Sequence, residues 1–181
     1  MRLRLSPIIL SALLVSGVQA QHSPDSGEQT NVIKSLSQKE IDDYRSGAGM
    51  GFAKAAELNH YPGPKHVLEL AAELQLTEPQ QARSKEIYET MRQEAMRLGK
   101  SIVEQEKALD QLFASTSIDQ KKISQITDRI AGLQGKLRAV HLAAHVATRT
   151  ILTHEQIEKY DALRGHTDKQ APANQENMHK H

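Results

Sequence analysis

A long run of apolar residues at alternating spacings of three and four is the feature that most constrains this chain. The run covers Ile123, Ile126, Ile130, Leu133, Leu137, Val140, Ala144, Ala147 and Ile151. Such spacings place apolar side chains on one face of an α-helix, and a face sustained over several heptads indicates a helix that packs along another helix. Residues 118–151 are therefore predicted to form a rod of about 50 Å, at 1.5 Å per residue.

A partner for this helix precedes it in the chain. Between Glu78 and Phe113, apolar residues again recur at spacings of three, four or seven, namely Ile87, Met91, Ala95, Leu98, Ile102, Leu109 and Phe113. The short connection 114–117 leaves room only for a reversal, so the two rods are expected to form an antiparallel hairpin. Aromatic residues make up only 3% of the chain, too few for an aromatic-rich β core.

Helix-start and helix-stop signals predict shorter helices around the hairpin. Ser37 and Glu40 have the spacing of a capping box, and the glycines at 47, 49 and 51 form a joint before a short helix over 52–58. Further helices are expected over 66–74 and 154–163, and a second capping box at Ser117 would begin the second rod. The predicted fold class is all-α: a long antiparallel helical hairpin with shorter flanking helices. Because a two-helix hairpin has a thin core, we expect an exposed apolar face that a homodimer or another apolar partner covers.

The first twenty residues have the pattern of a cleaved secretory signal peptide. Arg2 and Arg4 precede an apolar stretch over 8–15, and small residues end the segment at Ala20. We therefore expect export to the periplasm and no membrane span in the mature chain. Residues 21–36 are predicted to be a disordered lead-in, 37–66 short helices and a turn, 67–165 the main helical domain, and 166–181 a disordered tail.

Composition excludes several function classes. Lys and Arg number 23 against 22 Asp and Glu, so there is no basic surplus to neutralise nucleic-acid phosphates. The absence of cysteine excludes disulfides, thiolate metal sites and a cysteine nucleophile. Since no nucleophile motif is present either, we expect no enzyme activity and no required cofactor.

Two histidines form the candidate metal site. His141 and His145 are four residues apart, a spacing that places two imidazoles on one helix face, where they could bind Zn, Cu or Ni. The alternative is a partly solvated pair at the edge of the apolar face. His60, His66 and His154 could complete a site, and the terminal segment 178–181 could hold a soft metal loosely, but their spacing alone does not bring them together.

One motif occurs twice. Leu76, Thr77 and Gln80 begin the first rod as L-T-x-x-Q, and Leu152, Thr153 and Gln156 begin the last helix in the same way. In both copies, Thr is suited to be the N-cap and Gln to reach back to the N-cap N–H.

The chain resembles the Spy/CpxP family of periplasmic stress proteins in its paired motifs, the hairpin between them and the signal sequence. It is similar in the same features to the related periplasmic metal-resistance and metal-sensor proteins. The resemblance covers residues 67–165. It implies a curved homodimeric cradle that acts as an ATP-independent chaperone, with unfolded or misfolded periplasmic proteins as partners. For some members it implies instead an interaction with the periplasmic domain of a sensor, or binding of a divalent metal. The leading hypothesis is therefore a chaperone-like envelope-stress protein, and the alternative is a metal-binding sensor or resistance protein.

Overall fold

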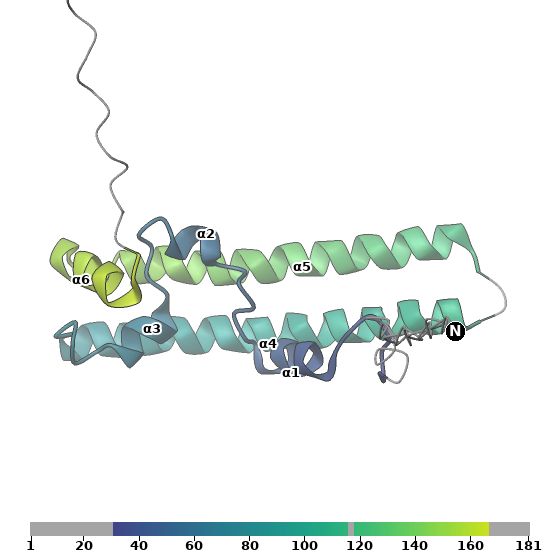
Figure 1. Cartoon of the computed structure of the whole chain (residues 1–181), viewed down its shortest axis with the longest axis horizontal. Coiled ribbons are helices and arrows are strands. Elements are labelled where there is room, and N and C mark those ends of the chain that lie inside the picture. The colour runs from purple at the N-terminus through teal and green to yellow at the C-terminus, as the bar shows by residue number, and fades with distance from the viewer. Residues whose placement is uncertain (1–30, 116–117, 167–181) are drawn as a thin grey trace, which may run out of the picture.

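The computed structural model describes residues 31–115 and 118–166. These residues form helices and no β-strand, with a single isolated bridge between Ile33 and Leu36. The helices are α1 (Gln38–Ser46), α2 (Lys54–Glu57), α3 (Pro64–Glu69), α4 (Glu78–Ala114), α5 (Gln120–Arg149) and α6 (His154–Arg164). The predicted all-α fold is confirmed (Figure 1). The predicted signal peptide lies outside the described residues, as does the tail from residue 167.

The two long helices, α4 and α5, lie antiparallel and form the body of the molecule (Figure 1). Several side chains that the spacing predicts are buried between them, including Ala95 and Leu98 on α4 and Leu137 and Ala144 on α5. Packing weakens toward the turn between the helices, where Phe113 is 56% exposed and Ile123 and Ile126 are only half-buried. The far end of the hairpin therefore presents apolar surface.

The segment before α1 is part of the core. Ile33 and Leu36 are 3% and 7% exposed and pack with Tyr44 of α1 against α4. The predicted disordered lead-in over 21–36 is therefore wrong at its end, because these two side chains are buried although most of the segment is polar. Residues 21–30 lie outside the described part. Gly99 makes the contact possible, since a Cβ placed there would overlap the carbonyl oxygen of Tyr44.

Residues 47–63, which we call the strap, connect α1 to α3. The strap leaves α1 at Gly47, a left-handed C-cap with φ 70°, and carries α2 across to α5 before the chain returns to α4 at α3 (Figure 1). Two non-glycine residues of the strap, Met50 and His60, also have positive φ. The strap thus covers one face of α5 with irregular backbone.

The repeated motif joins the helices at the base of the hairpin. Both predicted capping boxes are present, with Thr77 and Thr153 as N-caps. The two glutamines also form a reciprocal amide pair, in which Gln80 Nε2 donates to Gln156 Oε1 at 2.8 Å and Gln156 Nε2 donates to Gln80 Oε1 at 3.1 Å. Each copy therefore begins one helix, and the two copies together fasten α6 to α4.

Several predicted helix boundaries differ from the structure, and the helix predicted over 52–58 is limited to Lys54–Glu57. The helix predicted over 66–74 ends at Glu69, and turns occupy the following residues up to Gln75. The N-cap of α5 is Asp119, whose side chain accepts from the Lys121 N–H at 2.9 Å, and not Ser117. Asp119 is itself a favourable N-cap residue, so the helix begins two residues later than the capping-box spacing predicts.

Candidate functional site

The predicted histidine pair lies on α5, directly beneath the strap. His141 is 3% exposed and His145 is 7% exposed. The alternative of a partly solvated pair at the edge of the apolar face is therefore wrong, because the strap covers that edge. Buried imidazoles are uncommon without a partner or a function, so the surroundings of each ring are informative.

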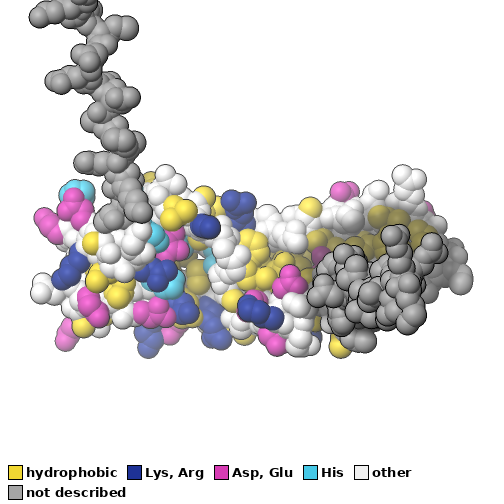
Figure 2. Space-filling view, viewed as in Figure 1, with side chains coloured by type: hydrophobic (Ala, Val, Ile, Leu, Met, Phe, Trp, Pro, Cys, Tyr) yellow, Lys and Arg dark blue, Asp and Glu magenta, His cyan; other side chains and the backbone are white. Residues whose placement is uncertain are grey.

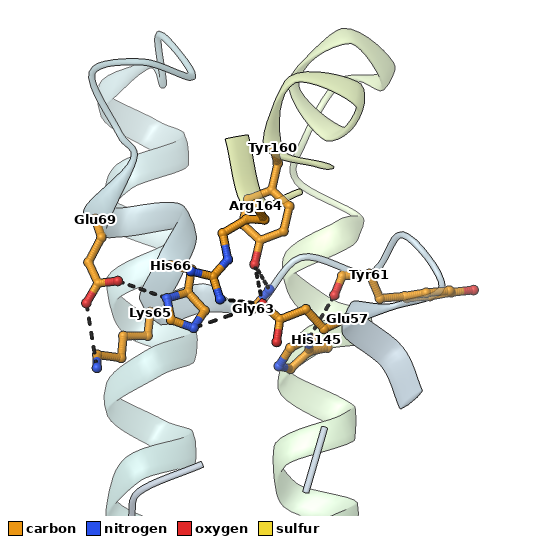
Figure 3. A network of polar contacts seen from close by, with 9 residues as sticks. All are labelled: Glu57, Tyr61, Gly63, Lys65, His66, Glu69, His145, Tyr160 and Arg164. Carbon is orange, nitrogen blue, oxygen red and sulfur yellow. Dashed lines mark hydrogen bonds and ion pairs between the residues drawn. The ribbon is translucent and has the colours of Figure 1, made fainter. Parts of the chain in front are cut away.

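His145 is held by the strap in a defined orientation. Its Nδ1–H donates to the backbone carbonyl of Tyr61 at 2.8 Å (Figure 3). A neutral imidazole that donates through Nδ1 keeps a lone pair on Nε2. Gly63 provides the space on that side, since a Cβ there would lie 2.9 Å from His145 Nε2.

His141 is packed by an aromatic ring but lacks a polar partner at one nitrogen. Its ring stacks on Phe52 of the strap, with centroids 5.8 Å apart and planes inclined by 21°. Its Nε2 is buried and has no hydrogen-bond partner within the described residues. An unsatisfied buried polar atom costs about 1–3 kcal/mol, so this nitrogen is a candidate ligand atom, as is the buried Nδ1 of His166, which also has no partner among the described residues.

Both imidazoles favour the neutral state. Burial lowers the pKa of His141, and the neighbouring His145 lowers it further. Burial also lowers the pKa of His145, although the hydrogen bond to Tyr61 and the charge of Glu57 oppose that shift. Neutral imidazole is the form that binds metal ions, so the pair is ready as a ligand near neutral pH.

The two histidines line an open pocket of about 600 Å³ between α5, the strap and α4. His66 also lines it, as do Glu57 and Met50 of the strap and Met91 of α4. Of the other predicted ligands, His60 is engaged elsewhere, with its Nδ1 2.7 Å from Asp161 Oδ2. His154 is exposed and pairs with Glu158, and residues 178–181 lie outside the described chain.

His166 also contributes to the wall of this pocket. We predicted it as the first residue of a disordered tail, but its backbone N–H donates to the Asp161 carbonyl at 2.8 Å and completes the end of α6. Its ring packs edge-on to Tyr160, with centroids 6.4 Å apart. The folded part of the chain therefore extends one residue beyond the boundary that we predicted.

Glu57 connects the pocket to α6. Its Oε1 accepts from the Tyr160 hydroxyl at 3.0 Å and from Arg164 Nη2 at 3.2 Å (Figure 3). His66 Nε2 lies 4.0 Å from the same oxygen. Burial alone would raise the pKa of Glu57. The hydrogen bond from Tyr160 and the charges of His66 and Arg164 outweigh burial, so the pKa of Glu57 is lowered. Glu57 is therefore a charged carboxylate shared between the pocket and α6.

This donor set suits a transition-metal ion but is not a complete cage. Imidazole nitrogens, thioethers and a carboxylate are ligands that zinc, copper and nickel accept. Within residues 31–115 and 118–166, however, no three His, Asp or Glu side chains are already placed to hold one ion. The pocket thus offers two preset imidazoles, and further ligands would have to move toward them.

Sequence reasoning found the histidine pair but missed the groups around it. Phe52 contributes a ring face, Tyr61 a backbone carbonyl and Gly63 the space left by a missing side chain. None of these features produces a spacing pattern in the sequence. Glu57 stands among many exposed acids in the sequence, and only its burial distinguishes it.

The fold and the pocket together define an all-α helical-hairpin protein with a histidine site beneath an irregular strap. A family model described as heavy-metal resistance matches residues 47–159, which include α4, α5, the strap and most of α6. The match covers more than half of the chain, so the protein belongs to the heavy-metal-resistance family, which is related to the Spy/CpxP-like helical periplasmic proteins. No curated protein and no solved structure matches the chain. In the described part of the chain, no helix combines the length and hydropathy that a bilayer crossing requires.

Proposed function

We propose that this protein is a periplasmic metal-binding protein that acts in heavy-metal resistance or sensing, and that it binds a Zn, Cu or Ni ion through His141 and His145. The observation that carries the proposal is the buried Nε2 of His141, which has no hydrogen-bond partner in the described part of the chain. Family membership supports the same class of ligand, and the predicted signal peptide supports a periplasmic location.

The environment of the histidine pair favours metal over a purely structural role. A metal-binding histidine usually donates its other ring N–H to a carbonyl or carboxylate, which fixes the ring and its tautomer. His145 has such an arrangement with Tyr61. Met50 and Met91 add thioethers to the pocket wall, and thioethers favour soft ions such as Cu(I).

A calorimetric titration of the full chain with zinc, nickel and copper salts tests this proposal. We expect a one-to-one site that is lost in the His141→Ala/His145→Ala variant and kept in a His154→Ala control, because His154 is exposed outside the pocket. Binding no tighter than millimolar in the parent, or equal binding in the parent and the double variant, would refute the proposal.

A second candidate function is binding of unfolded periplasmic protein on a chaperone-like homodimer, as in Spy/CpxP proteins. It is favoured by the apolar surface of the hairpin. A groove of about 390 Å³ between α4 and α5 is lined by Ile87, Val140 and Ala144, and Figure 2 shows further hydrophobic side chains gathered between the two helices. Phe113 and Ile118 are 56% and 53% exposed near the hairpin turn. Capture of a sensor's periplasmic domain would use the same kind of surface.

Aggregation of a reduced client protein, followed by light scattering, tests the second function. We expect slower aggregation at equimolar protein and a weaker effect when Phe113 and Ile118 are both replaced by Ser. Scattering at several protein concentrations measures the homodimer directly. No effect on aggregation at a tenfold excess would exclude the chaperone function and leave the metal proposal standing.

A further inference from the structure

We propose that Glu57 is the third ligand of the metal at His141 and His145, and that metal binding removes Glu57 from α6 and loosens the end of that helix. This inference rests on the proposed metal-binding function. It adds Glu57 to the two histidines as a ligand, and it predicts that the end of α6 becomes less ordered when metal is bound.

Glu57 lines the same pocket as the two histidines. It is the one acidic side chain among the described residues that line the pocket, and it lies between the rings of His66 and His145 in Figure 3. Its charge acts on His145 directly, because it opposes the lowering of the pKa of that histidine. A divalent ion at two neutral imidazoles would attract this carboxylate more strongly than a neutral ring does.

The carboxylate of Glu57 is at present used by α6. The Tyr160 hydroxyl and Arg164 both donate to Oε1. A metal–carboxylate bond would take negative charge and lone pairs from that oxygen, which would weaken both contacts with α6. The start of α6 would stay fixed, because the amide pair of Gln80 and Gln156 lies at its opposite end.

The position of Glu57 permits such a movement. It ends α2, a four-residue helix whose N-cap makes no side-chain hydrogen bond. The residues on α5 that would receive the ion belong to a long, well-packed helix. The strap is therefore expected to shift toward α5, and the pocket changes from a two-ligand to a three-ligand site.

Metal titrations of four full-length proteins, with zinc, nickel and copper salts alone as probes, test the ligand assignment. Glu57→Gln keeps an acceptor for Tyr160 and Arg164 but loses the charge, so we expect its metal affinity to fall about tenfold or more, in line with the loss of a metal-site partner. Glu69→Gln is the matched control, because Glu69 contacts His66 at 2.9 Å but does not line the pocket. Its affinity should remain that of the parent.

Arg164→Gln should change the affinity in the opposite direction. If the metal weakens the contact between Glu57 and Arg164, then Arg164 must weaken metal binding by the same factor. We expect the variant to bind metal about two- to fivefold more tightly, since a partly exposed ion pair contributes little. General destabilisation would not produce tighter binding.

Hydrogen exchange measures the proposed loosening. In the parent, amides of residues 160–166 should exchange faster with metal than without it, while those of 154–157 should not change. In Glu57→Gln the metal should leave 160–166 unchanged.

Parent-like affinity of Glu57→Gln together with parent-like exchange would overturn this inference and leave the histidine site in place. Absence of any binding by the parent would overturn the proposed function and this inference with it.

Discussion

Gly99→Ala is predicted to destabilise the protein, although it replaces glycine by alanine inside a helix. In an open helix this exchange stabilises by about 1 kcal/mol. At Gly99, however, α1 lies directly on α4. A Cβ there would overlap the carbonyl oxygen of Tyr44 and would lie 2.7 Å from its carbonyl carbon. Because these are backbone atoms, no change of rotamer relieves the overlap, and α1 itself has to move.

The magnitude follows from the contacts that α1 would lose. Overpacking of a closed contact costs about 1–3 kcal/mol, and overlap with backbone belongs at the upper end of that range. Complete release of α1 would cost more, since Ile41 and Tyr44 are buried and each fully buried large side chain contributes about 1.5–3 kcal/mol. A shift of α1 is therefore the cheaper response. After the gain in helix propensity, we expect a net loss of about 2 kcal/mol.

Gly132→Ala is the matched control on the other long helix. No atom lies within 4 Å of a Cβ placed at Gly132, so the same exchange should stabilise by about 1 kcal/mol. For a chain of this size, about 3 °C of melting temperature corresponds to 1 kcal/mol. Thermal unfolding followed by circular dichroism should therefore show Gly99→Ala about 6 °C below the parent and Gly132→Ala about 3 °C above it.

Limited trypsin digestion locates the effect. Lys39 and Arg45 lie on α1, so cleavage after them should accelerate in Gly99→Ala and not in Gly132→Ala. Equal stabilisation by both variants, with unchanged cleavage of α1, would refute the close packing of α1 on Gly99.

Three further predictions concern the pocket and the base of the hairpin. Gly63→Ala should reduce metal affinity in a calorimetric titration without loss of helix content, because the new Cβ would lie 2.9 Å from His145 Nε2; unchanged affinity would contradict the position of that ring. Gln80→Ala and Gln156→Ala should each lower the free energy of unfolding, measured in urea, by about 1 kcal/mol or more, because each removes a cap and part of the amide pair. The double variant should lower it by less than the sum of the two single variants. Burial lowers the pKa of His141 and of His145 below the ordinary 6.5. The unfolded chain therefore binds more protons than the folded one between pH 6.5 and the lowered pKa values of the folded state, and stability should fall as the pH falls through that window. Urea midpoints at several pH values check this slope, which should be smaller when both histidines are replaced by Ala.

The hairpin could be predicted from sequence because its core is built from one repeated spacing. Leu137 and Ala144 lie where the three-and-four pattern puts them, and they are buried. The N-terminal contact could not be predicted in this way. Ile33 and Leu36 show no helical spacing, and the adjacent Val32 is 79% exposed. Their burial depends on packing against α4, sixty or so positions further along the chain.

The repeated motif illustrates the same limit. The spacing of Thr77 to Gln80 and of Thr153 to Gln156 predicts two capping boxes, and both are present. The pairing of the two glutamines with each other is a tertiary contact. Local spacing contains no information about it, because each glutamine already satisfies its own helix start.

The histidine site has one feature that local spacing predicts and one that depends on tertiary contacts. The spacing of His141 and His145 predicts a shared helix face, but the degree of burial is set by the strap, whose glycines, single proline and positive φ angles give no periodic pattern. The burial of His141 also affects the stability of the protein. An apolar side chain at position 141 would pack against Phe52 without leaving a nitrogen unsatisfied, so a histidine there lowers the stability of the metal-free protein. Residues that reduce stability in a well-packed core are concentrated at functional sites, and this nitrogen, which has no partner among residues 31–115 and 118–166, is the atom that we propose as a metal ligand.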